Sequence, residues 1–138
     1  MPVFFAHQSI TFYGVVHAGW RGLTKGILKR TSILFTEHNL KLNEVDIYIG
    51  PSIQKCCFEV SKDIIDKFPP WSVKPKRSGK FRVDLQKIAV EELKVVGFNK
   101  NKIKISSDCS FCKKNNYYSY RRDGEKTGRM IGVISNEY

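Results

Sequence analysis

Long hydrophobic runs, acidic residues and histidines are all scarce in this sequence, which has only 3 histidines. No apolar stretch approaches the roughly 18 residues that a membrane-spanning helix requires. Residues 1–7 lack the basic segment and extended apolar core of a secretion signal. These absences predict a cytoplasmic protein that does not associate with membranes.

Acidic residues are outnumbered, since 24 Lys and Arg stand against 13 Asp and Glu and give a formal net charge of +11. Such a surface attracts polyanions without specificity. The basic residues are spread along the chain, and the one dense stretch, residues 74–82, contains Pro75 and Gly79, as in a solvated loop. No RNA-stacking signature or zinc-finger spacing accompanies it. Nucleic acid is therefore not the expected partner, and a basic nucleic-acid-binding domain stays only as an alternative.

The cysteines are few: Cys56, Cys57, Cys109 and Cys112. Disulfides are not expected without a secretion signal. A structural zinc site usually takes two well-spaced pairs of ligands, and two adjacent cysteines fit that geometry poorly. We therefore expect the four thiols to be reduced and not to share one metal.

The pattern of apolar residues predicts a single α/β domain over residues 1–138, a length typical of one domain. Strands are expected at residues 2–6, 10–16, 45–49, 81–83, 103–106 and 130–134. Helices are expected at 22–39, at 61–68 after Ser61, and at 84–96 between an Asp84 cap and Gly97. Strands that alternate with helices favour packed α/β layers.

The segment richest in chemical groups is residues 17–22, His-Ala-Gly-Trp-Arg-Gly. It places His17 at the end of a predicted strand, where α/β folds gather their ligands. The glycines allow close backbone approach, and Arg21 offers a planar, permanently charged fork for phosphate or carboxylate. A histidine packed in the core beside a surface arginine is the alternative interpretation.

Two further stretches are informative. Residues 49–60 combine a strand, a Gly-Pro turn and Cys56-Cys57, and by themselves they are equally consistent with a plain loop. Residues 117–124, Tyr-Tyr-Ser-Tyr-Arg-Arg-Asp-Gly, place aromatic rings beside Arg121 and Arg122, which together can hold a base by stacking and an anion by hydrogen bonds. The alternative there is a turn stabilised by an Arg–Asp pair.

In this order, the three stretches resemble the polyphenol oxidase or laccase-domain family, also described as purine nucleoside phosphorylases and peptidoglycan-editing factors. Residues 17–22 look like its hallmark motif. Residues 50–60 are similar to its second motif, and residues 108–112, 119–124 and 127–130 to its C-terminal signature. The resemblance covers almost the whole chain.

The resemblance implies a layered α/β sandwich with mixed sheets and a zinc ion held by two histidines and one cysteine. It implies phosphorolysis of adenosine, inosine and methylthioadenosine, or deamination of adenosine. By position, His17 corresponds to the second metal histidine and serves as catalytic metal ligand, while Arg21, Arg121 and Arg122 are the candidate substrate-binding residues. The expected partners are purine nucleosides and phosphate.

The other two family ligands would lie upstream of residue 1, so the sequence resembles the C-terminal portion of the family fold, incomplete at the N-terminus. His7 is a poor substitute, because a tetrahedral site needs convergent ligands. We therefore expect impaired activity in this chain alone, and self-association through an exposed sheet edge at residues 3–6. The alternative function is an inactive remnant that binds nucleosides or a protein partner.

Overall fold

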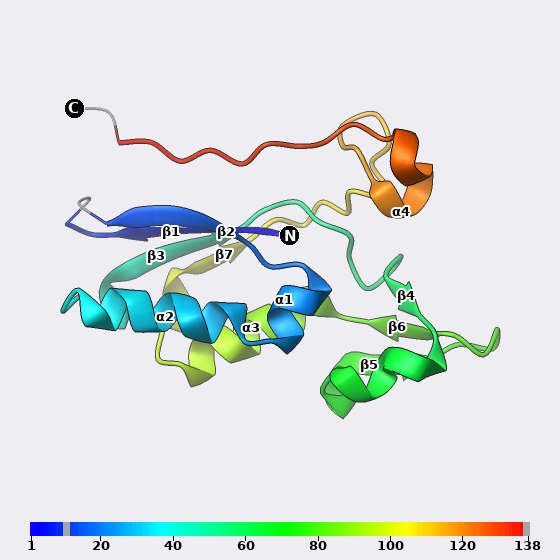
Figure 1. The fold of residues 1–138 in the computed structure, drawn as a ribbon, viewed down its shortest axis with the longest axis horizontal. Helices are drawn as coiled ribbons and strands as arrows, with labels where there is room; N and C mark the ends of the chain where they lie inside the picture. Colours follow the sequence, from blue (N-terminus) through cyan, green and yellow to red (C-terminus); the bar gives the residue numbers. More distant parts are fainter. Residues whose placement is uncertain (10–11, 137–138) are drawn as a thin grey trace.

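The computed structural model describes residues 1–9 and 12–136, which form two sheets and a layer of helices (Figure 1). The strands of the larger sheet are β1 (Pro2–His7), β2 (Tyr13–His17), β3 (Val45–Ile49) and β7 (Ile103–Ile105). The smaller sheet contains β4 (Glu59–Val60), β5 (Val73–Pro75) and β6 (Phe81–Val83). The α-helices are α1 (Trp20–Thr24), α2 (Ile27–Glu37), α3 (Leu85–Val95) and α4 (Tyr120–Asp123).

The larger sheet is mixed, with the strand order β2-β1-β3-β7. β1 is antiparallel to both β2 and β3, and β3 is parallel to β7. This mixed α/β architecture confirms the expected fold class. The expectation that residues 3–6 form a sheet edge is wrong, because β1 lies between two partners and its backbone is paired on both sides. The outer strands are β2 and β7.

The helices cover one face of the larger sheet (Figure 1). Side chains alternate along β1, so that Val3 and Phe5 point into the core. Phe5 packs against Phe35 of α2 and against Phe98, with ring centroids 5.9 and 5.7 Å apart. Phe4, on the opposite face, stacks with Tyr48 at 6.1 Å. The core is therefore a single layer between the sheet and the helices.

The helix expected at residues 22–39 is divided into α1 and α2. Gly26 adopts a left-handed backbone (φ 73°) at the division, which an α-helix cannot contain. The later helix agrees better with its prediction, because Asp84 accepts a hydrogen bond from the Lys87 backbone N–H at 3.0 Å and Gly97 (φ 110°) follows its end. Ser61 precedes a 3-10 helix, Lys62–Lys67, without a side-chain cap hydrogen bond.

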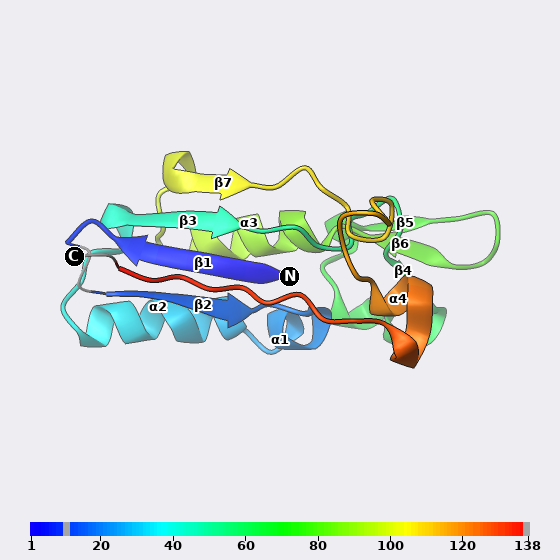
Figure 2. The ribbon, with the colours of Figure 1, turned by 90° about the horizontal axis from the view of Figure 1, so that it is seen from above.

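The strand expected at residues 130–134 is wrong. These residues are extended, but they have no strand partner, and they cross the face of the larger sheet that the helices leave open (Figures 1 and 2). Gly132 lies close to the Phe4 ring, where a Cβ atom would come within 3.1 Å. Ile131 and Val133 stay largely exposed. The apolar residues of this segment therefore predicted an extended backbone but not whether a neighbouring strand pairs with it.

The segments that carry the candidate site residues lie at one end of the larger sheet, where its strands begin or terminate (Figure 2). The carboxyl ends of β2, β3 and β7 meet there with the start of β1, as the pairs Pro2–His17, Val3–Ile49 and Ile49–Ile105 show. None of the helices in the described residues is long and apolar enough to cross a membrane.

Candidate functional site

His17 is the last residue of β2 and its side chain is exposed. The backbone N–H of Ala18 donates to the carbonyl of Met1 at 2.8 Å, which fixes the turn out of the strand. The ring folds back over Gly19, where an added Cβ would lie only 2.9 Å from Nε2. His17 is therefore at a strand end and outside the aliphatic core, as the sequence predicted.

The surroundings of His17 do not complete a metal site in this chain. Among residues 1–9 and 12–136, the only grouping of three or more candidate ligands is a set of cysteines, which does not include His17. His7 lies at the other end of β1, opposite Val45, where it is buried and hydrogen-bonded to Ser9 at 2.8 Å. The positive charge of the Met1 amino group, followed by partial burial, lowers the pKa of His17. The described residues thus offer one of the three ligands that the family resemblance implies.

Arg21 and Arg121 are connected through a row of aromatic rings. The guanidinium of Arg21 lies 4.3 Å from the Trp20 ring centroid. Trp20 packs against Phe68 at 5.9 Å, and Phe68 meets Phe58 edge-on at 6.4 Å. Arg121 completes the row, with its guanidinium 5.2 Å from the Phe58 centroid. These contacts bring the three sequence motifs to one end of the molecule, which sequence spacing alone did not establish.

The free hydrogen-bonding capacity of the two arginines differs. Arg121 donates to the Glu59 carbonyl at 2.6 Å. No ion pair or side-chain hydrogen bond of Arg21 is found within the described part of the chain, and the Lys67 ammonium lies 5.8 Å from the centroid of the same Trp20 ring. An exposed guanidinium without such a partner is suited to an anion such as phosphate. Lys67 had no motif around it that could have predicted this position.

Arg122 is held within the protein. Its Nε and Nη2 bind the Asp123 carboxylate at 2.9 and 2.8 Å, and Nη1 and Nη2 donate to the carbonyls of Ser110, Phe111 and Tyr117, each at 2.9 Å. All five N–H donors of the guanidinium are therefore engaged. The Arg–Asp pair, given above as the alternative interpretation of residues 117–124, is therefore present. Substrate binding by Arg122 stays a prediction that would require some of these hydrogen bonds to be exchanged.

The cysteines gather at one point, where they could hold a metal ion, although their spacing led us to expect that they would not share one. The sulfurs of Cys56, Cys57, Cys109 and Cys112, hereafter the cysteine cluster, lie within 4.8 Å of one another. All four thiols are free, as expected. Burial raises the pKa of Cys56 and Cys57, and hydrogen bonds among the thiols contribute. Burial opposes ionisation of Cys109 as well, but the backbone N–H groups of Gln54 and Cys112 lower the pKa of Cys109 to about 7.

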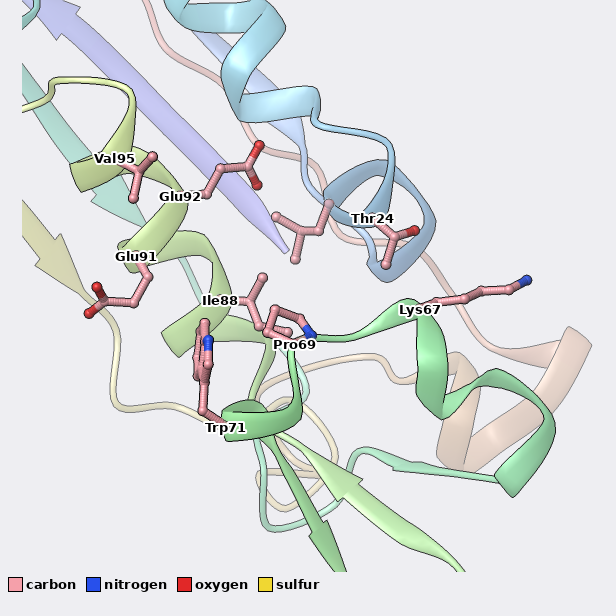
Figure 3. A pocket seen from close by; sticks show the side chains of 9 residues that line it. Thr24, Lys67, Pro69, Trp71, Ile88, Glu91, Glu92 and Val95 are labelled. Carbon is pink, nitrogen blue, oxygen red and sulfur yellow. The ribbon is translucent and has the colours of Figure 1, made fainter.

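A separate open pocket of about 350 Å³ lies between α1, α3 and the 3-10 turn at Pro70–Ser72 (Figure 3). Its lining includes the exposed Trp71 and the carboxylates of Glu91 and Glu92. Burial raises the pKa of Glu92, which accepts a hydrogen bond from the Lys29 backbone N–H at 3.2 Å. None of the predicted site residues lines this pocket.

Comparison with known proteins identifies the family. The family model described as "Multi-copper polyphenol oxidoreductase laccase" matches residues 1–137. The chain belongs to this family. The family resemblance carried by residues 17–22 and the two later motifs is thereby confirmed.

Bacterial proteins named as purine nucleoside phosphorylases are similar to this chain. The chain is 32% identical to "Purine nucleoside phosphorylase YlmD" of Geobacillus stearothermophilus, over 97% of this chain and 52% of that protein. It is 34% identical to a "Purine nucleoside phosphorylase" of Haemophilus influenzae, over 97% of this chain and 56% of that protein. The chain thus spans about half the length of these relatives.

Solved structures share the fold. The crystal structure of YlmD from Geobacillus stearothermophilus superposes with a TM-score of 0.84 at 29% identity, covering 92% of this chain and 50% of that chain. The structure of a Bacillus licheniformis protein called YfiH gives a TM-score of 0.83 at 28% identity, over 90% of this chain and 50% of that chain. The mixed α/β arrangement described above is therefore the arrangement of this family.

Proposed function

We propose that this chain forms part of a zinc-dependent purine nucleoside phosphorylase. The observation that carries the proposal is the row of aromatic rings that joins Arg21, in the same motif as His17, to Arg121 at one end of the molecule. The names of relatives that align with 97% of the chain support the same activity.

The reaction needs a bound phosphate dianion and a nucleoside held against it. A phosphate oxygen forms a bond to C1′ of the ribose while the bond from C1′ to the purine nitrogen breaks, and the departing purine accepts the electron pair and a proton. Arg21 binds the phosphate, because its guanidinium has no ion pair or side-chain hydrogen bond within residues 1–9 and 12–136. Arg121 lines the same end and orients the substrate.

Zinc in such a site needs more than His17. Three protein ligands and one open position are the usual arrangement of a catalytic zinc. The described residues place no further ligand beside His17, so a zinc ion there would need ligands besides those that these residues supply. No catalytic step is assigned to a metal in this chain alone, and we expect the chain alone to show impaired turnover.

Two proteins test this proposal: the 138-residue chain, and the same chain joined to the sequence encoded directly upstream of it. Release of free base from adenosine, inosine and methylthioadenosine is measured with and without phosphate, and ammonia release detects deamination of adenosine. We expect phosphate-dependent release of base from the extended protein and little from the chain alone. Equal turnover by the chain alone would contradict the assignment of missing ligands, and ammonia without base release would replace phosphorolysis by deamination.

Arg21→Ala in the extended protein tests the phosphate site. Loss of a hydrogen bond to a charged group, worth about 1.5–3 kcal/mol, predicts a decrease of roughly 10- to 100-fold in kcat/KM for phosphate. Lys25→Ala is the matched control, since Lys25 follows α1 and is an exposed cation on the same turn. A similar decrease in both variants would show that only the general positive field matters, and would remove Arg21 from the proposed site.

A further inference from the structure

The cysteine cluster joins two loops that are far apart in sequence. Cys56 and Cys57 lie between β3 and β4, and Cys109 and Cys112 lie in the turn that follows β7. The sulfur of Cys112 is 3.8 Å from that of Cys56 and 3.3 Å from that of Cys57. We propose that the cysteine cluster binds one structural zinc ion through all four sulfurs, at a site separate from His17.

The distances between the sulfurs fit a single ion. Zinc–sulfur bonds of about 2.3 Å in a tetrahedron place the sulfurs about 3.8 Å apart. The separation of 3.8 Å between Cys56 and Cys112 equals this value, and the full spread of 4.8 Å requires shifts of about 1 Å to close around an ion. Clusters of several irons need ligands placed around a wider core, whereas sulfurs this close enclose one tetrahedral ion.

Backbone hydrogen bonds hold the two loops around the sulfurs together. Ser52 exchanges backbone hydrogen bonds with the second loop, donating to Asp108 at 3.4 Å and accepting from Ser110 at 3.1 Å. The Gln54 N–H points at the sulfur of Cys109 from 3.5 Å. Backbone donors directed at a ligand sulfur are the type of outer contact that orients metal ligands. The two loops therefore present the four sulfurs together before any ion is bound.

Basic residues stand next to the ligands of such a site in the sequence. Four thiolates and one Zn²⁺ carry a net charge of −2. Lys55 directly precedes the first pair of ligands, and Lys113 and Lys114 directly follow the last one. Lys113 binds Asp108 at 2.5 Å and Lys55 lies 3.7 Å from Asp84, so two of these cations are already held by acids near the loops. Lys114 remains exposed beside Cys112.

A site closed by four protein ligands has no open position for substrate, so this ion is structural. It fastens the loop before β4, which carries Phe58 and Glu59, to the segment that leads to α4. Arg121 contacts Phe58 and Glu59 across that junction. The zinc site is thus independent of the proposed activity, although it stabilises the end of the molecule where the activity is proposed.

The test begins with the metal content of the 138-residue chain, expressed with zinc present and purified under reducing conditions. We expect one zinc per chain. Replacement of zinc by cobalt should give the intense visible and sulfur-to-metal absorption bands of tetrahedral thiolate ligation. A thiol-specific reagent should release the zinc as four thiols are modified.

The variants separate this site from His17. Cys112→Ser is expected to reduce bound zinc at least tenfold, while His17→Ala should retain one zinc per chain. If Cys112→Ser fails to fold, the cobalt spectrum and the thiol count of the wild-type chain decide. Zinc that is retained by Cys112→Ser, zinc that is lost in His17→Ala, iron in place of zinc, or disulfides in the protein purified under reducing conditions would each overturn the proposal.

Discussion

Arg122 provides the sharpest test of how the loop before α4 is held. Its side chain is 15% exposed, and its guanidinium donates to the carbonyls of Ser110, Phe111 and Tyr117. Each such bond contributes about 1 kcal/mol net, so Arg122→Ala should lower the free energy of unfolding by about 3 kcal/mol. With a urea m-value of about 2 kcal/mol/M, the midpoint should fall by about 1.5 M.

Urea unfolding is followed by circular dichroism in the presence of a chelator, so that bound metal does not contribute to the measured stability. Arg122→Lys retains the charge but loses the planar fork, and we expect it to recover only part of the loss. Arg121→Ala is the matched control, because within the described residues that side chain makes a single carbonyl hydrogen bond and is exposed. A change below 1 kcal/mol in Arg122→Ala, or full recovery by Arg122→Lys, would refute the reasoning.

Three further outcomes are expected. Gly19→Ala should leave the fold intact but displace the His17 ring, since the new Cβ would meet the ring 2.9 Å away; the NMR shifts of His17 should change while the unfolding midpoint stays nearly constant. Arg122 lowers the pKa of Asp123, so the ionised carboxylate stabilises the folded state above its ordinary pKa of 3.8 and this stabilisation is lost as the pH falls below that value. Asp123→Asn should therefore reduce the loss of stability at acid pH. The pKa of Glu92 is raised by burial, so its ionisation destabilises the fold at neutral pH; Glu92→Gln should raise the thermal midpoint at pH 7 and have no such effect near pH 3, and a lower midpoint at pH 7 would contradict this.

Local patterns in the sequence predicted the elements that local forces determine. The pattern of apolar residues located β1 and β3, and the Asp84 cap with Gly97 located α3. The order of the strands depends on contacts that are distant in sequence, so β1 was mistaken for an edge although it is central. Gly26 divides a helix whose apolar spacing continues across it, because the left-handed backbone there is not visible in a periodicity.

The candidate site shows the same difference between features set by local sequence and features set by contacts distant in sequence. His17 was located correctly because a motif that follows a strand must lie at the end of that strand. The cysteines were judged by their spacing, which is unfavourable, whereas their position depends on β3 and β7 being parallel neighbours. Loops that follow parallel neighbours leave the sheet at the same edge, so Cys57 and Cys109 come together whatever their separation in sequence.

The end of the molecule that carries the proposed site depends on a few specific contacts more than on the core. The described residues from 107 to 119 contain no strand or helix, and the Arg122 hydrogen bonds and the cysteine cluster connect them to the rest. Segments with little buried apolar surface open at lower free energy than packed strands and helices. A zinc ion in the cysteine cluster would fasten this segment to the loop before β4 without adding to the hydrophobic core. Metal at the cysteines and arginine at α4 therefore act on the same segment, and each limits how far the other can move.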